Sequence, residues 1–380
     1  MPHPRLNRFS VKLRPLAERQ NKKRAENDFV PPDRPPSALS PAAAAVVAEA
    51  VERIRAARAA GKPVMLAFGA HAIKNGLAPV LIRLIENGWV TLLATNGAGV
   101  IHDWEFAFQG SSSEDVKAGV ERGEFGNWQE TGFCINLAIN VGAYEGKGYG
   151  EAVGAFIEND GVSIPEPARL EAEVKAGAGT DPEQAAAAAD LLAIIRAHGL
   201  RPGALKVAHP FKRFSAQAAA YRLGVPFTAH PMIGHDIIYN HPMNHGASLG
   251  RAAVRDFLVF AEQVSRIGGG VYLSVGSAVM SPMVFEKSMS MGQNLARQQS
   301  RRIEGHFICV VDLAESRWDW TRGDPPESSP DYYLRYNKSF SRMGGTMRYA
   351  TADNRDFLLA LWQGLGPAGN RANPLATVAT

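Results

Sequence analysis

Residues 64–100 read VMLAFGAHAIKNGLAPVLIRLIENGWVTLLATNGAGV and decide the fold. Two short apolar runs, 64–68 and 90–95, flank a segment in which apolar residues recur at helical spacing. Such runs, without polar alternation, are typical of strands that are buried on both faces of a parallel sheet. A strand, a glycine-containing turn, a helix and a second strand within about thirty residues predict a βαβ unit.

The same alternation continues along the chain. Helices are predicted at 41–61, 183–198, 215–223, 248–266 and 353–364, and further strands at 204–208, 225–229, 271–275, 306–312 and 347–350. Strands alternating with helices in this way predict an α/β fold with one doubly wound, Rossmann-like parallel sheet.

Composition shifts along the chain predict three regions. Residues 1–40 form a basic, proline-rich arm, residues 41–365 a single α/β nucleotide-binding domain with a helical insertion near 110–200, and residues 366–380 a flexible tail. The arm lacks interleaved aromatic residues and any nucleic-acid-binding motif. We therefore expect it to fold back or to pack on a neighbouring subunit.

The bulk composition is that of a globular protein with a sizeable core. The 380 residues are 46% hydrophobic and 21% charged. Cys134 and Cys309 lie in apolar surroundings, which favours two core residues in a reducing compartment over a disulfide. No apolar run is long enough for a membrane span, and no apolar segment follows the basic N-terminus as in a secretory signal. The expected location is the cytoplasm, without a membrane or nucleic-acid partner.

Small or polar residues follow most of the predicted strands. Ligands of open parallel sheets bind outside the carboxyl ends of the strands, where small residues let the backbone approach a ligand closely. The segments at these ends are 69–71, 96–103, 230–236, 276–278 and 312–315. No GxGxxG follows the first strand, so the usual dinucleotide fingerprint is absent. The pattern predicts a ligand crevice, although a tight turn alone also explains each glycine.

The segment TNGAGV at 95–100 resembles the TTAGGV element of deoxyhypusine synthases. Similar elements occur in the order expected for that family, and the likeness covers roughly 60–365. They are GAHAIKNGL (69–77), VPFTAHPMIGHD (225–236), GGGVYLSVGSAV (268–279), FICVVDLAE (307–315) and MRYATADNRDFLLALW (347–362). The resemblance implies an NAD-binding fold of the deoxyhypusine synthase type, usually a homotetramer with the nucleotide held between subunits.

The resemblance also implies which residues contact NAD. They are Gly69, Ala70, His71, Asn75, Thr95, Asn96, Gly97, Ala98, Gly99, Gly276, Ser277, Asp312, Leu313, Ala314, Thr351 and Ala352.

Members of that family transfer an aminobutyl group through an imine on a lysine in an SWGK motif. Here the corresponding stretch is Arg335-Tyr336-Asn337-Lys338, so Lys338 is the candidate nucleophile. An imine-forming lysine needs desolvation or neighbouring positive charge to release its proton. The alternative is a solvated loop lysine without a catalytic role.

The predicted substrate differs from that of the family. The aspartate-rich stretch that binds a polyamine is replaced by residues 317–322, RWDWTR. A polycation needs carboxylates, so spermidine is not expected, and an anionic or aromatic substrate fits better. The predicted substrate-binding residues are Arg317, Trp318, Trp320, Arg322 and Tyr336.

Histidines and acids near the strand ends are candidates for acid–base catalysis. His102 and Asp103 stand where the family has acidic residues, and His235 and Asp236 follow another strand. Imidazole beside carboxylate suits proton transfer near neutral pH. The histidines between 230 and 245 match no zinc spacing, so no metal site is predicted. Structural roles for these histidines remain the alternative.

Together these observations predict an NAD-binding, deoxyhypusine-synthase-like enzyme. It would carry out redox or group-transfer chemistry on a small substrate other than spermidine. One alternative is a non-catalytic nucleotide-binding or regulatory protein of the same fold. Another is a metal-dependent hydrolase or lyase that uses the histidine-rich loop 230–245.

Overall fold

Six of the predicted strands form one parallel sheet in the computed structural model, which describes residues 3–368. They are β2 (Val64–Phe68), β3 (Leu92–Thr95), β7 (Phe227–Ala229), β8 (Val271–Val275), β9 (Phe307–Asp312) and β10 (Thr346–Thr351). Their order across the sheet is β10-β9-β8-β2-β3-β7, and every pairing is parallel. Numbered along the chain, the strands lie in the order 3-2-1-4-5-6 of a doubly wound Rossmann-type sheet. The predicted fold class is confirmed.

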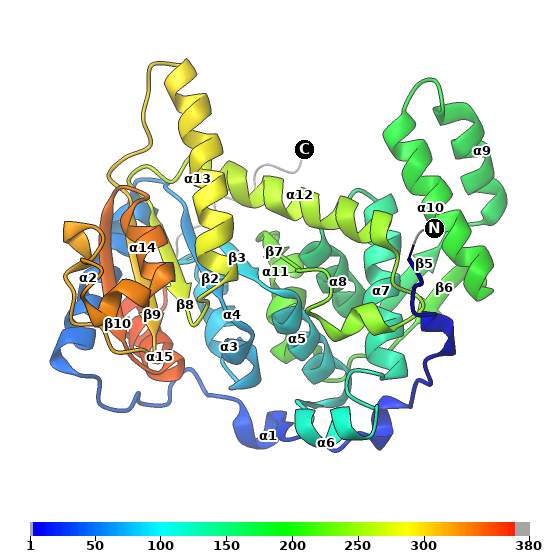
Figure 1. Ribbon diagram of the computed structural model, residues 1–380, viewed down its shortest axis with the longest axis horizontal. Coiled ribbons are helices and arrows are strands. Elements are labelled where there is room, and N and C mark those ends of the chain that lie inside the picture. The colour runs from blue at the N-terminus through cyan, green and yellow to red at the C-terminus, as the bar shows by residue number, and fades with distance from the viewer. Residues whose placement is uncertain (1–2, 369–380) are drawn as a thin grey trace.

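Helices cover both faces of this sheet (Figure 1). Val64, Leu66 and Phe68 belong to one hydrophobic cluster, whereas Met65 and Ala67, between them in β2, belong to a second. The first cluster includes residues of α2 (Pro41–Ala59), α4 (Ala78–Glu86), α11 (Ala216–Leu223) and α15 (Asn354–Leu365). The second includes residues of α12 (Gly246–Ser265), α13 (Met280–Gln298) and α14 (Arg335–Ser341). Burial on both faces explains why these strands are continuous apolar runs.

The segment between β3 and β7 is a largely helical insertion. Its elements are α5 (Gly97–Gln109), β4 (Ser111–Ser112), α6 (Val116–Glu121), α7 (Gln129–Tyr144), α8 (Tyr149–Glu158), β5 (Gly161–Ile164), α9 (Pro167–Gly177), α10 (Pro182–His198) and β6 (Gly203–Lys206). The strand expected at 204–208 is β6, but it lies outside the main sheet and pairs antiparallel with β5. Its residues are mostly exposed, because an antiparallel hairpin does not need the two buried faces of a central parallel strand.

The N-terminal arm folds back along the domain and contributes structure of its own. Strand β1 (Lys23–Arg24) pairs antiparallel with β4, and the short helix α1 (Ala25–Asp28) follows it. Leu16 is buried in the main hydrophobic cluster. In Figure 1 the arm runs in blue along the lower edge of the molecule, past α6, and includes α1. Of the predicted tail, residues 369–380 lie outside the described part of the chain.

Both cysteines are buried and free, as predicted for core residues. Within residues 3–368, no helix combines the length and the apolar character needed to cross a membrane.

Candidate active site

The strand order reverses between β2 and β8, and two glycines meet at that point. The amide of Gly69 donates to the carbonyl of Val275 at 3.0 Å. A Cβ atom on Gly69 would lie 2.0 Å from the carbonyl oxygen of Gly276, so no side chain fits there. Gly276 has φ +59°, and a Cβ on it would meet Nδ2 of Asn354 at 2.3 Å. The reversal of strand order, where ligands of this fold bind, is therefore lined by bare backbone.

A cavity of about 200 Å³ lies near the carboxyl ends of β2, β3 and β7. Its wall includes Lys74 of α3 (Ala70–Lys74), His102 of α5, and His235 and Asp236 of the loop after β7. Arg19 of the N-terminal arm lines it as well. The structure thus brings three of the predicted catalytic residues to one small cavity.

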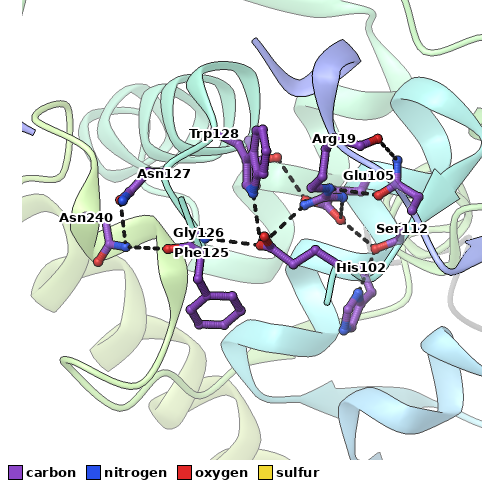
Figure 2. A network of polar contacts seen from close by, with 12 residues as sticks. Arg19, His102, Glu105, Ser112, Phe125, Gly126, Asn127, Trp128 and Asn240 are labelled. Atoms are coloured by element: carbon purple, nitrogen blue, oxygen red, sulfur yellow. Dashed lines mark hydrogen bonds and ion pairs between the residues drawn. The ribbon is translucent and has the colours of Figure 1, made fainter. Parts of the chain in front are cut away.

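A chain of polar contacts runs from His102 to the arm (Figure 2). His102 Nδ1 lies 2.7 Å from Ser112 Oγ, and Ser112 Oγ donates to Glu105 Oε2 at 2.5 Å. Arg19 donates to both carboxylate oxygens of Glu105, at 2.8 and 2.6 Å. Thr131 Oγ1 adds a third donor to Glu105, at 2.9 Å. Every oxygen of this buried carboxylate therefore has a partner.

The pKa values of His102 and Glu105 are shifted in directions that their burial and these contacts explain. Burial lowers the pKa of His102 to about 4, against the opposing charge of Glu105. Burial would raise the pKa of Glu105, but the charge and hydrogen bonds of Arg19 outweigh it and hold that pKa below its usual value. Near neutral pH the pair is therefore a neutral imidazole and an ionised carboxylate.

Asp236 closes the cavity on the side of the α5 N-terminus. A Cβ atom on Gly97 would lie 2.1 Å from Asp236 Oδ2, so this carboxylate packs directly on the first residue of α5. Oδ2 is buried and has no hydrogen-bond partner among the described residues. Burial raises the pKa of Asp236 to about 6, which allows it to gain or lose a proton near neutral pH.

Glu114 connects the cavity to the loop before α7. Its Oε1 accepts from Trp128 Nε1 at 2.9 Å and from the amide of Gly126 at 3.1 Å. The same oxygen lies 4.0 Å from Arg19. Burial raises the pKa of Glu114, because these contacts do not fully offset the loss of water.

Asp103, the neighbour of His102, points elsewhere and does not line this cavity. Its buried carboxylate accepts from the hydroxyl of Ser215 and from the amides of Ala216 and Gln217 at the start of α11. Burial raises its pKa despite these donors. The geometry gives Asp103 a capping position on α11.

Several residues predicted to contact NAD make local contacts at the strand ends. Thr95 is buried and donates through Oγ1 to the carbonyl of Phe68 at 2.9 Å. Asn96 caps α5 by accepting from the amide of Gly99 at 2.9 Å. Asp312 accepts from the amides of Leu313 and Ala314 in its own turn, at 2.7 and 3.3 Å.

The other predicted NAD contacts are distributed along the same edge. His71 is exposed on α3 and Asn75 is its C-cap, whereas Ala98 lines the cavity. Ser277 is buried after β8 and accepts from the amide of Ser281 at 3.2 Å. The remaining residues are Ala70 at the start of α3, Thr351, whose hydroxyl donates to the carbonyl of Ala314, and buried Ala352.

Lys338 lies on α14, outside the wall of the His102 cavity. Its Nζ is 3.4 Å from the ring centroid of Tyr332, a cation–π geometry. Tyr336, on the same helix, lies with its hydroxyl 3.3 Å from that of Tyr349.

The aromatic and arginine residues at 317–322 form a local cluster near α14. Trp320 is buried in the second hydrophobic cluster, so its ring is not free to stack on a ligand. Arg322 lies 5.3 Å from the ring of Trp318, whereas Arg317 is exposed.

The histidines between 230 and 245 make separate contacts. His230 lies 3.0 Å from Thr228 Oγ1, His241 accepts from the amide of Met243 at 3.0 Å, and His245 caps α12. Within residues 3–368, no three His, Cys, Asp or Glu side chains are grouped as metal ligands.

Sequence reasoning did not identify Arg19, Glu105 or Ser112 as site residues. Glu105 had a readable signal, because an acid three residues after His102 shares its face of a largely apolar helix. Arg19 and Ser112 had no such signal, since their positions depend on how the arm folds back.

No protein-family model matches the sequence, and no curated protein matches it. A solved structure of AgrE with ornithine and NAD⁺ is 15% identical, with a TM-score of 0.42 over 86% of this chain and 34% of that one. A mutant of AgrE in a binary complex with L-arginine is 14% identical, with a TM-score of 0.42 over 87% of this chain and 34% of that one. A putative LOR/SDH protein from Methanococcus maripaludis S2 is 13% identical, with a TM-score of 0.42 over 88% of this chain and 73% of that one. The chain spans about a third of the length of the AgrE chains.

Proposed function

We propose that this chain is an NAD-dependent enzyme that acts on a small substrate at the carboxyl edge of its parallel sheet. One observation carries the proposal: the cavity that holds His102 lies at the same edge as the bare backbone of Gly69 and Gly276. In sheets of this topology, nucleotides bind where the strand order reverses. A titratable group in a cavity beside that point is typical of an enzyme.

The residues at the reversal fit a nucleotide through close approach of the backbone. We propose that Gly69, Ala70, Gly276 and Ser277 line the nucleotide, with Asn354 next to them. A Cβ atom on Gly69 would collide with the Gly276 carbonyl oxygen, so the two strand ends pack backbone against backbone here. Helix α3 has only five residues. The dinucleotide would therefore be held by the strand ends together and not by one glycine-rich turn.

The deoxyhypusine-synthase-like sequence elements support NAD as the nucleotide and redox or group-transfer chemistry. We propose the same edge residues for its contacts, from Thr95–Gly99 to Asp312–Ala314. The exposed or half-buried arginines and tryptophan at 317–322 favour an anionic or aromatic substrate over a polyamine. A homotetramer is part of this proposal.

The side chains of the cavity supply acid–base chemistry. His102 Nε2 makes no hydrogen bond to any residue between 3 and 368, and it is the ring nitrogen left to accept a substrate proton. Asp236 and Lys74 line the same cavity and would orient polar groups of the substrate. A bound nicotinamide would supply a hydride acceptor.

The test is binding of the nucleotide. Purified protein is denatured and the supernatant is analysed for NAD by mass spectrometry, and protein stripped of ligand is melted with and without added NAD⁺. We expect released NAD or a clear rise of Tm with NAD⁺. Protein that releases no NAD and shows no change of Tm at millimolar NAD⁺ would contradict the proposal.

A second measurement separates catalysis from binding alone. The variant His102→Asn should keep the rise of Tm with NAD⁺ and lose turnover in a screen of small alcohols, amines and amino acids. If wild type binds NAD⁺ yet turns over no compound, the non-catalytic nucleotide-binding alternative is favoured.

A further inference from the structure

The N-terminal arm is held in place on both sides of Arg19. On one side, the amide of Arg14 donates to the carbonyl of Asn127 at 2.9 Å, and Gln129 donates back to Arg14 at 2.8 Å. On the other side, β1 pairs with β4 so that Lys23 lies opposite Ser112. The strand that carries Ser112 and the arm that carries Arg19 are therefore fixed relative to one another.

The side chain of Arg19 is buried within the domain. It is 3% exposed, and its partner Glu105 is 1% exposed. The guanidinium donates one hydrogen bond to each carboxylate oxygen of Glu105, and through Nε it donates to Asn21 Oδ1 at 2.7 Å. A buried, unpaired carboxylate would take up a proton. Because arginine stays charged in proteins, this contact keeps Glu105 ionised.

An ionised Glu105 determines the direction of the next two hydrogen bonds. A carboxylate only accepts, so the single proton of the Ser112 hydroxyl must point at Glu105 Oε2. The lone pair of Ser112 Oγ then faces His102 Nδ1, at 2.7 Å. Nδ1 must carry the proton of this contact, which leaves Nε2 of the neutral ring unprotonated.

We propose that Arg19 is a positioning residue that sets the tautomer of His102 through Glu105 and Ser112. The arm thereby completes the site: without it, Glu105 would lose its counter-ion and Ser112 its fixed proton. This inference rests on the proposed function in one respect only, namely that His102 Nε2 is the atom that accepts a proton from the substrate. The proton arrangement itself follows from the contacts.

Other charged and titratable groups also face His102. His71 and Lys74 of α3 oppose its protonation, as Arg19 does, and Glu105 favours it. Glu114, His235 and Asp236 line the same cavity. The lysine and the histidines lie outside the Arg19–Glu105–Ser112 chain, so they change how readily the ring is protonated. They do not decide which nitrogen of the neutral ring holds the proton.

Nuclear magnetic resonance of the histidine ring nitrogens tests the proposal without substrate or cofactor. Full-length protein is labelled with ¹⁵N-histidine, and the His102 signals are assigned by their loss in His102→Gln. At about pH 7, wild type should show protonated Nδ1 and unprotonated Nε2 for His102. Protonated Nε2 with unprotonated Nδ1 would overturn the inference.

Two variants test the individual links. Ser112→Ala keeps the Arg19–Glu105 pair and should abolish the preference for protonated Nδ1. Arg19→Gln should weaken that preference, because Glu105 without its counter-ion takes up a proton and no longer fixes the direction of the Ser112 hydroxyl. Arg24→Gln is the matched control, an exposed arginine five positions further along the same arm, and should change neither signal.

Folding of each variant is checked by circular dichroism. If Arg19→Gln does not fold, Ser112→Ala still tests whether the Ser112 hydroxyl sets the tautomer of His102. A folded Arg19→Gln or Ser112→Ala protein with the wild-type tautomer of His102 would contradict the proposal. Failure of NAD⁺ to raise Tm would refute the proposed function and leave these ring signals unaffected, so the two failures are distinguishable.

Discussion

Gly69 and Gly276 meet back to back where β2 and β8 end, with no room for a side chain on Gly69 between them. The distance from a Cβ on Gly69 to the Gly276 carbonyl oxygen would be 2.0 Å. These two residues join the halves of the doubly wound sheet at the point where we place the nucleotide.

Gly69→Ala should therefore destabilise the fold. The extra methyl group must push apart two neighbouring strands, and we expect a loss of about 1–3 kcal/mol in the free energy of unfolding. Urea denaturation measures it, and the effect of NAD⁺ on Tm should shrink in parallel. The control is Gly250→Ala in α12, where a Cβ meets nothing within 4 Å. This change should stabilise the protein by about 0.5–1 kcal/mol, because alanine favours a helix. Equal free energies of unfolding for the two variants would contradict the close approach of Gly69 to Gly276.

Asp256 of α12 connects β7, whose following loop lines the cavity, with the start of α8. Its buried Oδ2 accepts from the amide of Gly150 at 2.8 Å and from that of Ala229 at 2.7 Å. Asp256→Ala leaves both amides unsatisfied and should cost about 2–4 kcal/mol of unfolding free energy. Asp256→Asn retains one acceptor oxygen and should cost less. Chemical denaturation of both variants checks this order, and an Asn variant less stable than the Ala variant would contradict it.

His209 should make the protein sensitive to acid. It is buried among Trp104, Phe108 and Phe156, and burial lowers its pKa to about 4 against the nearby charge of Asp160. The unfolded chain, with a histidine pKa of 6.5, binds more protons than the folded chain between these values. The contribution to stability is therefore full above pH 6.5 and is lost as the pH falls towards 4.

The variant His209→Phe measures that contribution. The loss of unfolding free energy between about pH 7.5 and about pH 4.5 should be smaller in the variant than in wild type by up to roughly 2 kcal/mol. Urea denaturation at both pH values gives the difference. Identical losses in the two proteins would mean that His209 is not held neutral in the fold. His102, His230 and His241 also have lowered pKa values, so wild type and variant share the remaining acid sensitivity.

Lys338 should react with carbonyl compounds more readily than a surface lysine, if it forms an imine as proposed from the family resemblance. Protein is treated with a limiting amount of a short aldehyde and with borohydride, and labelled peptides are quantified by mass spectrometry. We expect Lys338 to be labelled several times more than Lys287 of α13, which is exposed and paired with Glu286. Equal labelling of the two lysines would contradict the imine role.

The architecture was largely predictable from local patterns. The helix predicted from residue 41 is α2, which Ser40 caps by accepting from the amide of Ala43. The strand predicted at 271–275 is β8, buried on every residue. The strand predicted at 204–208 is present as β6, but its place in the main sheet was predicted wrongly, because a short apolar run does not show whether its partner strands lie in the main sheet or in a hairpin.

The site was only partly predictable. His102, His235 and Asp236 were identified because they follow strands of a parallel sheet, and the carboxyl ends of such strands lie at one edge. Asp103 was expected beside them, but successive residues of a helix point about 100° apart, so it faces α11.

The sequence by itself determined the alternation of buried strands with helices and hence the edge at which we place the ligand, because burial on two faces requires continuous apolar runs. Only the tertiary structure decided which side chains share the cavity. Arg19 and Glu105 are 86 positions apart, and their contact depends on the pairing of the arm with β4. A contact of this kind leaves no local pattern in the sequence, because the helix or strand propensity of Arg19 does not depend on Glu105, and that of Glu105 does not depend on Arg19.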